Sequence, residues 1–354
     1  MHVLDSDPNN TSKPCLLLLH GFPELAFSWR KLLPYLVNSG YRVIAPDQRG
    51  FGLTKGSNQG FNIELDSYRY LNLVQDIVGL LTSLKIEKLQ SIVGHDFGSY
   101  VAAYCSLIRP DLLNSVILMS MPFAGPPILS SEDMAGDCTL EKLNRQLGFL
   151  QKPRKHYQLY FSESETNKDL MNCPQGLHKF LRAYFHFKSA DYLGNNPHPL
   201  TSWNADEMAK LPTYYIMEKH MGMPETVAQE MPNEETIAKC VWLTEEELRV
   251  YSDAFKSTGF QGGLNWYRAR FVKKFIKEQQ IFSGKKIEVP SLFIAGENDW
   301  GIFQSPGALE NMRTKACSNM LDCHLIKNAG HWVQQEQPES VAELINNFLF
   351  EIKT

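Results

Sequence analysis

The chain has 354 residues, of which 43% are hydrophobic and 21% are charged, and its formal net charge is -4. This length predicts one large domain or two, and the composition is that of a globular protein with a sizeable core. The small negative charge gives no attraction for nucleic acid or for an anionic membrane surface. The seven cysteines form no C-x-x-C pair, and no apolar run reaches the roughly 18 residues that a membrane span needs, so we expect a cytoplasmic protein with reduced thiols.

Short apolar runs alternate with segments of helical spacing over the first 120 residues. Strands are predicted at residues 15–19, 41–45, 89–93 and 115–120. Helices are predicted at residues 27–39 and 68–84, and Gly40 ends the first of them. This alternation is typical of a parallel sheet built from strand–helix–strand units.

The alternation stops between residues 122 and 280, a segment rich in aromatic, Met, Pro and charged residues without a clear buried strand. It resumes with predicted strands at 287–295 and 321–326 and a final helix at 338–350. The predicted fold class is therefore α/β, a mostly parallel sheet with helices on both faces and an inserted helical cap. The predicted core comprises residues 1–126 and 281–354, and the predicted cap comprises residues 127–280.

A possible nucleophile lies where the strand predicted at 89–93 meets a helix-like run that begins at Tyr100. Between them stands Gly94-His-Asp-Phe-Gly98, which matches the strand–turn–helix motif G-x-S-x-G with Asp in place of Ser. The glycines allow the close backbone approach that such a turn needs. The motif is weak evidence alone, because the same pentapeptide pattern also fits many surface turns.

Three candidate groups, Asp96, Asp299 and His331, each stand in a loop directly after a predicted core strand. Loops after parallel strands meet at one edge of the sheet, so these side chains can converge. Asp299 alone could be a turn former and His331 alone a packing histidine, but their joint placement favours a catalytic triad. The neighbouring His20 and His95 are expected only to support the turns in which they lie.

Four motifs together resemble the epoxide hydrolases of the α/β-hydrolase fold. They are His20-Gly-Phe-Pro23, Gly94-His-Asp-Phe-Gly98, Asp299 after a strand, and Gly330-His-Trp332. The resemblance covers nearly the whole chain and implies that the insertion is a helical cap. It also implies a small hydrophobic epoxide and water as reactants, with no cofactor, metal or nucleic acid, and a monomer or homodimer. The Cys and His residues show no zinc-binding spacing, and no phosphate-binding glycine loop is present.

An aspartate at the turn predicts a two-step hydrolysis. A carboxylate with a reference pKa of about 3.9 is ionised at neutral pH and needs no base to attack a saturated carbon. We expect Asp96 to form an alkyl ester, which water activated by His331 and Asp299 then hydrolyses. The resemblance and the motif geometry both indicate the backbone N–H groups of Phe22 and Phe97 as the oxyanion hole.

Opening an epoxide leaves an alkoxide, and a neutral tyrosine is a suitable donor to it. The resemblance implies one tyrosine in each of two cap segments, Tyr157 in residues 155–161 and Tyr267 in Asn265-Trp-Tyr-Arg268. Alternatives within the cap are Tyr160, Tyr214 and Tyr215. Since the chain has 14 tyrosines, a cap tyrosine chosen at random would more often serve packing.

The substrate-binding surface is expected to be aromatic and apolar, formed by Phe22, Phe97, Trp266 and Trp332. One alternative function is a haloalkane or haloacid dehalogenase with the same aspartate nucleophile. The cap tyrosines count against it, because a halide leaving group needs Trp, Asn or Arg donors. A non-catalytic ligand-binding protein is a further alternative, because a fold alone does not fix function.

Overall fold

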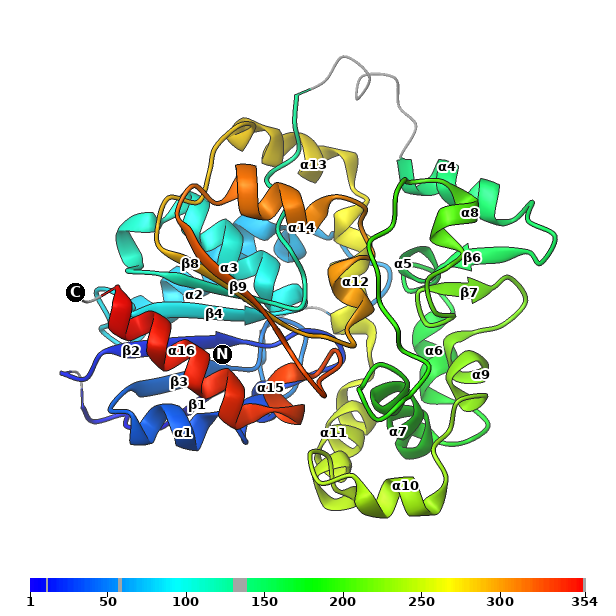
Figure 1. Cartoon of the computed structure of the whole chain (residues 1–354), viewed down its shortest axis with the longest axis horizontal. Helices are drawn as coiled ribbons and strands as arrows, with labels where there is room; N and C mark the ends of the chain where they lie inside the picture. The colour runs from blue at the N-terminus through cyan, green and yellow to red at the C-terminus, as the bar shows by residue number, and fades with distance from the viewer. Residues whose placement is uncertain (11, 57–58, 130–138, 353–354) are drawn as a thin grey trace.

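The computed structural model describes residues 1–10, 12–56, 59–129 and 139–352, and it shows a sheet-based core with a second lobe beside it (Figure 1). Within these residues, seven strands form one sheet in the order β1-β3-β2-β4-β5-β8-β9. The strands are β1 (Val3–Asp5), β2 (Cys15–Leu19), β3 (Arg42–Pro46), β4 (Ser91–His95), β5 (Val116–Met119), β8 (Ser291–Gly296) and β9 (Met320–Ile326). Only the edge pair β1–β3 of this sheet is antiparallel, so the predicted mostly parallel sheet is confirmed.

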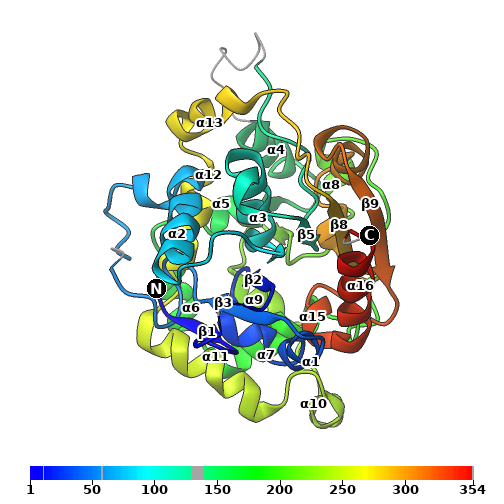
Figure 2. The ribbon, with the colours of Figure 1, turned by 90° about the vertical axis from the view of Figure 1, so that its left-hand side faces the viewer.

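Helices cover both faces of the sheet, so both faces are apolar. Successive side chains of each strand point to opposite faces. Along β2, Leu16 and Leu18 join one buried cluster, whereas Leu17 and Leu19 join a second cluster on the other face. Helices α1 (Leu33–Asn38) and α16 (Pro338–Glu351) cover the first face, and α2 (Tyr70–Ser83) and α3 (Phe97–Ile108) cover the second (Figure 2). The other core elements are η1 (Ala26–Trp29), η2 (Asp66–Tyr68), η3 (Pro110–Leu112), η6 (Trp300–Ile302), α14 (Ala308–Asn311), η7 (Met312–Ala316) and α15 (Val333–Glu336).

The segment inserted between β5 and β8 is mainly helical, as predicted, and most of it forms the second lobe (Figure 1). It contains α4 (Thr139–Leu147), α5 (Tyr157–Tyr160), α6 (Thr166–Met171), α7 (Leu177–Phe187), α8 (Ala205–Met208), α9 (Met223–Ala228), α10 (Glu234–Lys239), α11 (Glu245–Thr258), α12 (Gln261–Arg270), α13 (Lys273–Gln279) and η5 (Gln280–Phe282). It also contains an antiparallel pair, β6 (Arg154–His156) and β7 (Ile216–Glu218), that the sequence analysis did not predict. Strands of three residues are too short to show a period-two pattern. None of the described helices is long and apolar enough to cross a membrane.

Two predicted elements differ from the structure for local reasons. The helix predicted at 27–39 is divided into η1 and α1, because Pro34 has no N–H and is accepted only in the first turn of a helix. The strand predicted at 287–295 begins at Ser291, directly after Pro290, and Ile287 forms only an isolated bridge to Cys317. Both differences lie away from the loops that carry the candidate site.

Helix α12 docks the cap against the core and fixes one wall of the site. The backbones of Gly262 and Gly50 are in such close contact that a Cβ atom on either would overlap the other residue. The Trp266 indole N–H donates to the carbonyl oxygen of Arg49 at 2.9 Å, and Arg268 Nη1 donates to that of Phe61 at 2.7 Å. The core–cap boundaries at residues 127 and 280 remain a prediction.

Candidate active site

The site is organised by a sharp turn between β4 and α3, at Asp96. Asp96 has φ of 51° and ψ of -117°, a left-handed backbone conformation that residues other than glycine rarely adopt. A Cβ atom on Gly94 would overlap the Gly98 carbonyl, and one on Gly98 would overlap the Leu19 carbonyl. The glycines of the pentapeptide are therefore required by packing, and the turn raises the Asp96 carboxylate above the edge of the sheet.

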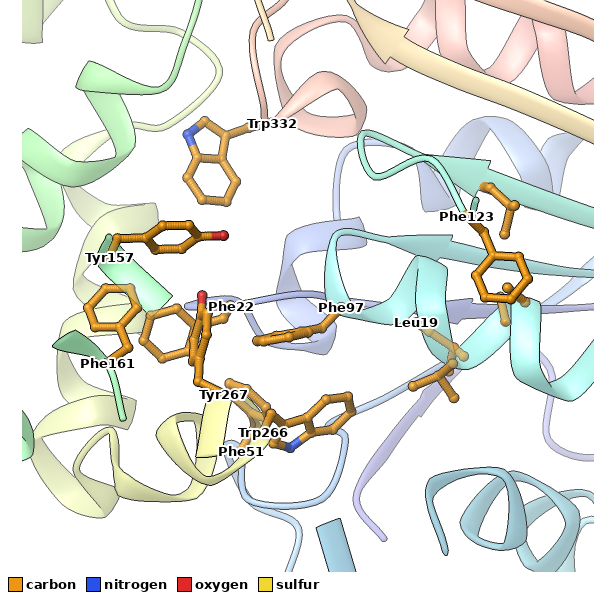
Figure 3. Packing of buried hydrophobic residues seen from close by; sticks show 14 of the residues in the cluster. Leu19, Phe22, Phe51, Phe97, Phe123, Tyr157, Phe161, Trp266, Tyr267 and Trp332 are labelled. Carbon is orange, nitrogen blue, oxygen red and sulfur yellow. The ribbon is translucent and has the colours of Figure 1, made fainter. Parts of the chain in front are cut away.

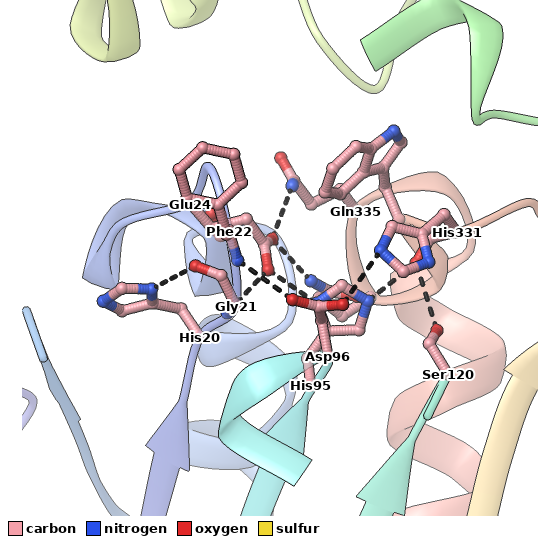
Figure 4. Close-up of polar contacts among 12 residues, drawn as sticks. His20, Gly21, Phe22, Glu24, His95, Asp96, Ser120, His331 and Gln335 are labelled. Atoms are coloured by element: carbon pink, nitrogen blue, oxygen red, sulfur yellow. Dashed lines mark hydrogen bonds and ion pairs between the residues drawn. The ribbon is translucent and has the colours of Figure 1, made fainter. Parts of the chain in front are cut away.

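The Asp96 carboxylate lies between the turn that follows β2 and the loop that follows β9 (Figure 4). Its Oδ1 accepts a hydrogen bond from the backbone N–H of Phe22 at 3.1 Å. Its Oδ2 lies 3.7 Å from Nε2 of His331, which is beyond normal hydrogen-bond distance. One carboxylate oxygen is thus held by a backbone donor, and the other faces the histidine.

His331 and Asp299 form a buried pair, each with a side chain only 1% exposed. His331 Nδ1 lies 3.1 and 3.2 Å from the carboxylate oxygens of Asp299, which orients its Nε2 toward Asp96. Burial alone would raise the pKa of Asp299, but the His331 charge and hydrogen bond, with the Gly301 N–H, hold it below its usual value. Burial, followed by the charge of Lys188, lowers the pKa of His331, so this imidazole is neutral near pH 7 and can act as a base.

A second buried histidine–carboxylate pair, His95 and Glu24, lies next to Asp96 (Figure 4). His95 Nδ1 lies 2.6 Å from a carboxylate oxygen of Glu24, and its Nε2 lies 2.7 Å from the backbone carbonyl oxygen of His331. Both partners are acceptors, so both ring nitrogens donate and His95 is a cation. Although burial opposes both charges, His95 lowers the pKa of Glu24 to about 2, and Glu24 raises the pKa of His95. Glu24 also accepts from the Gly21 N–H at 2.9 Å, which ties the Phe22 turn to the His331 loop.

The predicted cap tyrosines lie on the opposite side of the site from the sheet. Their rings are 5.9 Å apart, and the hydroxyls of Tyr157 and Tyr267 point into the same space beside Phe22 and Phe97 (Figure 3). The Tyr157 hydroxyl donates to Gln304 at 2.9 Å and accepts from Gln158 at 3.1 Å. Burial raises the pKa of both tyrosines above the ordinary value, so each hydroxyl is a neutral donor at neutral pH.

The alternative tyrosines are engaged elsewhere or lie behind Tyr157. Tyr160 donates to Asp169, and Tyr214 donates to Asn195 at 3.0 Å. Tyr215 packs its ring 5.0 Å from that of Tyr157. The Tyr157 hydroxyl also donates, to Gln304, but its ring lies 5.9 Å from that of Tyr267, and this contact favours Tyr157 over these neighbours as the partner of Tyr267.

The aromatic residues predicted to line the pocket divide into two layers (Figure 3). Phe22 and Phe97 contact the Tyr267 ring with centroids 5.4 and 4.6 Å away, and Trp332 lies 4.7 Å from the ring of His331. Trp266 instead packs behind Phe97, at 5.5 Å. The structure thus brings Phe22, Phe97 and Trp332 to the nucleophile and places Trp266 one layer further out.

Three polar residues of the site were missed by the sequence analysis, or given a smaller role. Glu24 and His95 form the ion pair beside the nucleophile, and Gln304 binds Tyr157. The only sequence signal for Glu24 was a charged residue directly after the His20-Gly-Phe-Pro23 motif, and Gln304 gave none. A buried glutamate needs a partner, but the sequence does not show which residue supplies it.

The matching family model is described as "alpha/beta hydrolase fold" and spans residues 14–338. The chain therefore belongs to the α/β-hydrolase fold family. The sequence is 30% identical to epoxide hydrolase B of Mycobacterium tuberculosis over 358 residues, covering 99% of this chain and 95% of the relative. Within the family the chain thus groups with proteins named as epoxide hydrolases, which agrees with the resemblance found in its motifs.

Solved structures agree with this grouping. An epoxide hydrolase from an endophytic Streptomyces superimposes with a TM-score of 0.77 at 27% identity, covering 99% of this chain and 92% of that one. Potato (Solanum tuberosum) epoxide hydrolase I gives a TM-score of 0.75 at 27% identity, covering 99% and 95%. The predicted fold class, an α/β-hydrolase core with an inserted cap, is confirmed.

Proposed function

We propose that the protein hydrolyses an apolar epoxide to a vicinal diol through a covalent ester on Asp96. The observation that carries this proposal is the Asp96 carboxylate, with one oxygen 3.1 Å from the Phe22 N–H and the other 3.7 Å from the His331 imidazole. The tyrosine hydroxyls opposite supply the donors that an opening epoxide needs. The names of the relatives support the same reaction.

In the first step, Asp96 Oδ2 attacks an epoxide carbon, because Oδ1 is already engaged by Phe22. A C–O bond to Asp96 forms as the ring C–O bond breaks, and the electron pair of the broken bond stays on the epoxide oxygen. The hydroxyls of Tyr157 and Tyr267 stabilise that oxygen, and one of them supplies its proton. Donors fixed in advance where charge develops are a large source of catalysis.

In the second step, neutral His331 takes a proton from water, and the resulting hydroxide attacks the carbonyl carbon of the ester. Negative charge moves to Asp96 Oδ1, which the backbone N–H groups of Phe22 and Phe97 stabilise. Collapse of this intermediate releases the diol, whose departing oxygen takes the proton held by His331. The proton left on the new Asp96 carboxyl group returns the tyrosinate to its neutral form, so Asp96 is a carboxylate again. The oxygen of the water remains in the Asp96 carboxylate, and Asp299 holds the imidazole in position throughout.

The indole N–H groups of the two tryptophans predicted to line the pocket argue against the dehalogenase alternative. The N–H of Trp266 donates to Arg49, and that of Trp332 donates to the Phe185 carbonyl at 2.8 Å, so neither is free to bind a halide. The tyrosine hydroxyls are better suited to an oxygen leaving group, which gains a proton. The His331–Asp299 pair argues against a purely ligand-binding role, because it equips the site to activate water.

The activity itself is tested with a panel of aryl, terpenoid and fatty-acid epoxides, assayed for diol beside a panel of haloalkanes assayed for halide. We expect diol from at least one epoxide and no halide, with diol formation abolished in Asp96→Asn during short incubations. Halide release without diol would support the dehalogenase instead. Binding of an epoxide without turnover would support the non-catalytic alternative.

The covalent step is tested with His331→Gln, which removes the base for the second step but leaves the nucleophile. We expect this variant to gain the mass of one substrate on Asp96 and to hydrolyse the ester slowly, as seen by intact-protein mass spectrometry. Peptide mapping should place the added mass on Asp96, and an Asp96→Asn, His331→Gln variant should show no addition. A His331→Gln protein that stays unmodified by a confirmed substrate would contradict the two-step mechanism.

The cap tyrosines are tested by Tyr→Phe substitutions, which remove a hydroxyl and little volume. Each single variant should keep part of the rate of adduct formation, because the other hydroxyl still donates to the oxygen. The Tyr157→Phe, Tyr267→Phe double variant should lose about 10²–10³-fold or more in that rate, since the alkoxide would form without a donor in an apolar pocket. Rapid-mixing measurements should place the loss in adduct formation and leave hydrolysis of the ester unchanged.

Tyr160→Phe is the matched control, because this hydroxyl donates to Asp169 and not into the site. It should form the adduct at the wild-type rate. A double variant that also alkylates at the wild-type rate would exclude Tyr157 and Tyr267 from this role.

A further inference from the structure

Lys188 is a buried cation in the wall of the site, directly after α7. Only 4% of the residue is exposed. Its ammonium nitrogen lies over a set of aromatic rings, at 5.0 Å from the centroid of Tyr215, 5.4 Å from Tyr184, 5.5 Å from Trp332 and 5.7 Å from Tyr214. These rings come from α7, from the segment before β7 and from the catalytic His331 loop, so the cation is held where the cap meets the core.

Among the described residues, the acidic groups whose charges act on Lys188 are Asp96, Asp299 and Glu24, and each of them is engaged by another partner. Buried lysines are usually paired, because removing an ammonium group from water is costly. Aromatic faces offset part of that cost through cation–π attraction, which is stronger when the cation is desolvated. A buried charge kept without an acidic partner beside an active site suggests a function for the charge itself.

The cation is coupled to the catalytic histidine by rigid contacts. The backbone N–H of His331 donates to the Lys188 carbonyl oxygen at 2.8 Å. The Trp332 indole lies against both residues, 4.7 Å from the His331 ring and 5.5 Å from the Lys188 ammonium. A Cβ atom on Gly330 would overlap the backbone of Lys188 and Ser189, so the two loops fit closely. The distance between the lysine and the imidazole is therefore fixed by packing.

We propose that Lys188 is a positioning residue whose charge holds His331 in the neutral form that removes a proton from water. This inference rests on the proposed function, in which His331 acts as the base for ester hydrolysis. The lysine acts on the reaction through the histidine and makes no contact with the reacting atoms in this mechanism.

The other charges around His331 explain why a nearby cation is needed to keep the imidazole neutral. Asp299 at Nδ1 and Asp96 beyond Nε2 both favour a protonated imidazole. His95, whose ring lies 5.0 Å from that of His331, is a cation but is paired with Glu24. Formation of the ester removes the charge of Asp96, and Lys188 then opposes the remaining charge of Asp299.

One more carboxyl group lies behind the His331 loop. Glu336 accepts hydrogen bonds from the backbone N–H groups of Ala190, Gly330 and Trp332, at 2.8, 2.9 and 3.0 Å. Burial raises the pKa of Glu336 to about 8 against the effect of these donors. Because this group titrates near the same pH range, the effect of Lys188 has to be measured as a difference between variants that all retain Glu336.

The expected direction follows from the charges. Burial has the largest effect and lowers the pKa of His331. The charge of Lys188 has the next largest effect and lowers it further, whereas Asp299 raises it. Hydrolysis of the ester requires neutral His331, so its rate falls as the pH drops through that pKa. Burial lowers the pKa of Lys188 itself, and the charges of Asp96, Asp299 and Glu24 oppose that shift. Removing the lysine charge should therefore raise the pKa of His331 and move the acid limb of the rate profile to higher pH.

The test compares Lys188→Met, Lys188→Gln and Lys188→Arg with the wild type. Preformed alkyl-enzyme is mixed into buffers between about pH 5 and about pH 9, the range of histidine titration, and single-turnover hydrolysis is followed. We expect the acid limb to move upward by about one pH unit in the Met and Gln variants, the effect typical of a neighbouring charge. The Arg variant keeps the charge and should restore the wild-type profile.

Lys155→Met is the matched control, because Lys155 also lies over a tyrosine ring, 4.8 Å from the centroid of Tyr160, but away from His331. Its profile should match the wild type. Equal loss of rate at every pH in the Lys188 variants, without movement of the acid limb, would show a purely structural role and overturn the proposal.

A second readout separates this inference from the proposed function. Proteins labelled with ¹⁵N-histidine are titrated by NMR, and the His331 signals are identified from His331→Gln. The pKa of His331 should rise by about one unit in Lys188→Met and Lys188→Gln, whether or not an ester forms. A rise without any adduct would uphold the charge effect and contradict the hydrolase mechanism. An adduct with an unchanged His331 pKa would uphold the mechanism and overturn the role of Lys188.

Discussion

The left-handed backbone at Asp96 is the constraint on which the rest of the site depends. A non-glycine residue in such a conformation costs roughly 1–3 kcal/mol and persists only where surrounding contacts enforce it. Here β4 is paired with both β2 and β5, and the glycines at 94 and 98 leave no space for another arrangement. In return, the turn presents the carboxylate to the Phe22 N–H and begins α3 at Phe97. Each remaining group of the site comes from a loop or cap element that packs around this turn.

The second constraint on the site is the balance between negative and positive charges around His331. A carboxylate nucleophile is already ionised, so the histidine is needed only for the step that uses water. The carboxylates of Asp96 and Asp299 would tend to protonate that histidine, whereas the His95–Glu24 pair is internally neutral. Lys188 adds the positive charge that opposes them, and aromatic rings shield it from solvent. Trp332 belongs both to this set of rings and to the aromatic residues beside His331, so the surroundings of Lys188 and the apolar wall of the site share one residue.

The sequence predicted the parts of the site that depend on chain order. Asp96, Asp299 and His331 each follow a core strand, and parallel strands bring such loops to one edge whatever the details of packing. Tyr157 and Tyr267 were reached only through the resemblance to epoxide hydrolases, because nothing in their local spacing distinguishes them from other cap tyrosines. The structure brings these five residues together, and their catalytic roles stay a prediction.

The features of the site that the sequence did not predict depend on contacts between distant elements. Lys188 gains its position from rings that three separate segments supply, and Gln304 contacts Tyr157 across 147 residues of chain. The β6–β7 pair was too short to show a pattern, and Pro34 divided a helix whose spacing looked continuous. For Lys188 and Gln304 the missing information was the position of a partner, whereas the β6–β7 pair and the division at Pro34 were missed for local reasons.

The central claim, that the substrate becomes bonded to Asp96, is tested most directly by the fate of the water oxygen. A single turnover in ¹⁸O-water, with enzyme in excess over epoxide, should give a diol without the label. The label should appear in the peptide that contains Asp96, because the attacking water replaces the carboxylate oxygen that leaves with the product. A diol that carries ¹⁸O after the first turnover, with Asp96 unlabelled, would show that water attacks the epoxide directly and would contradict the account.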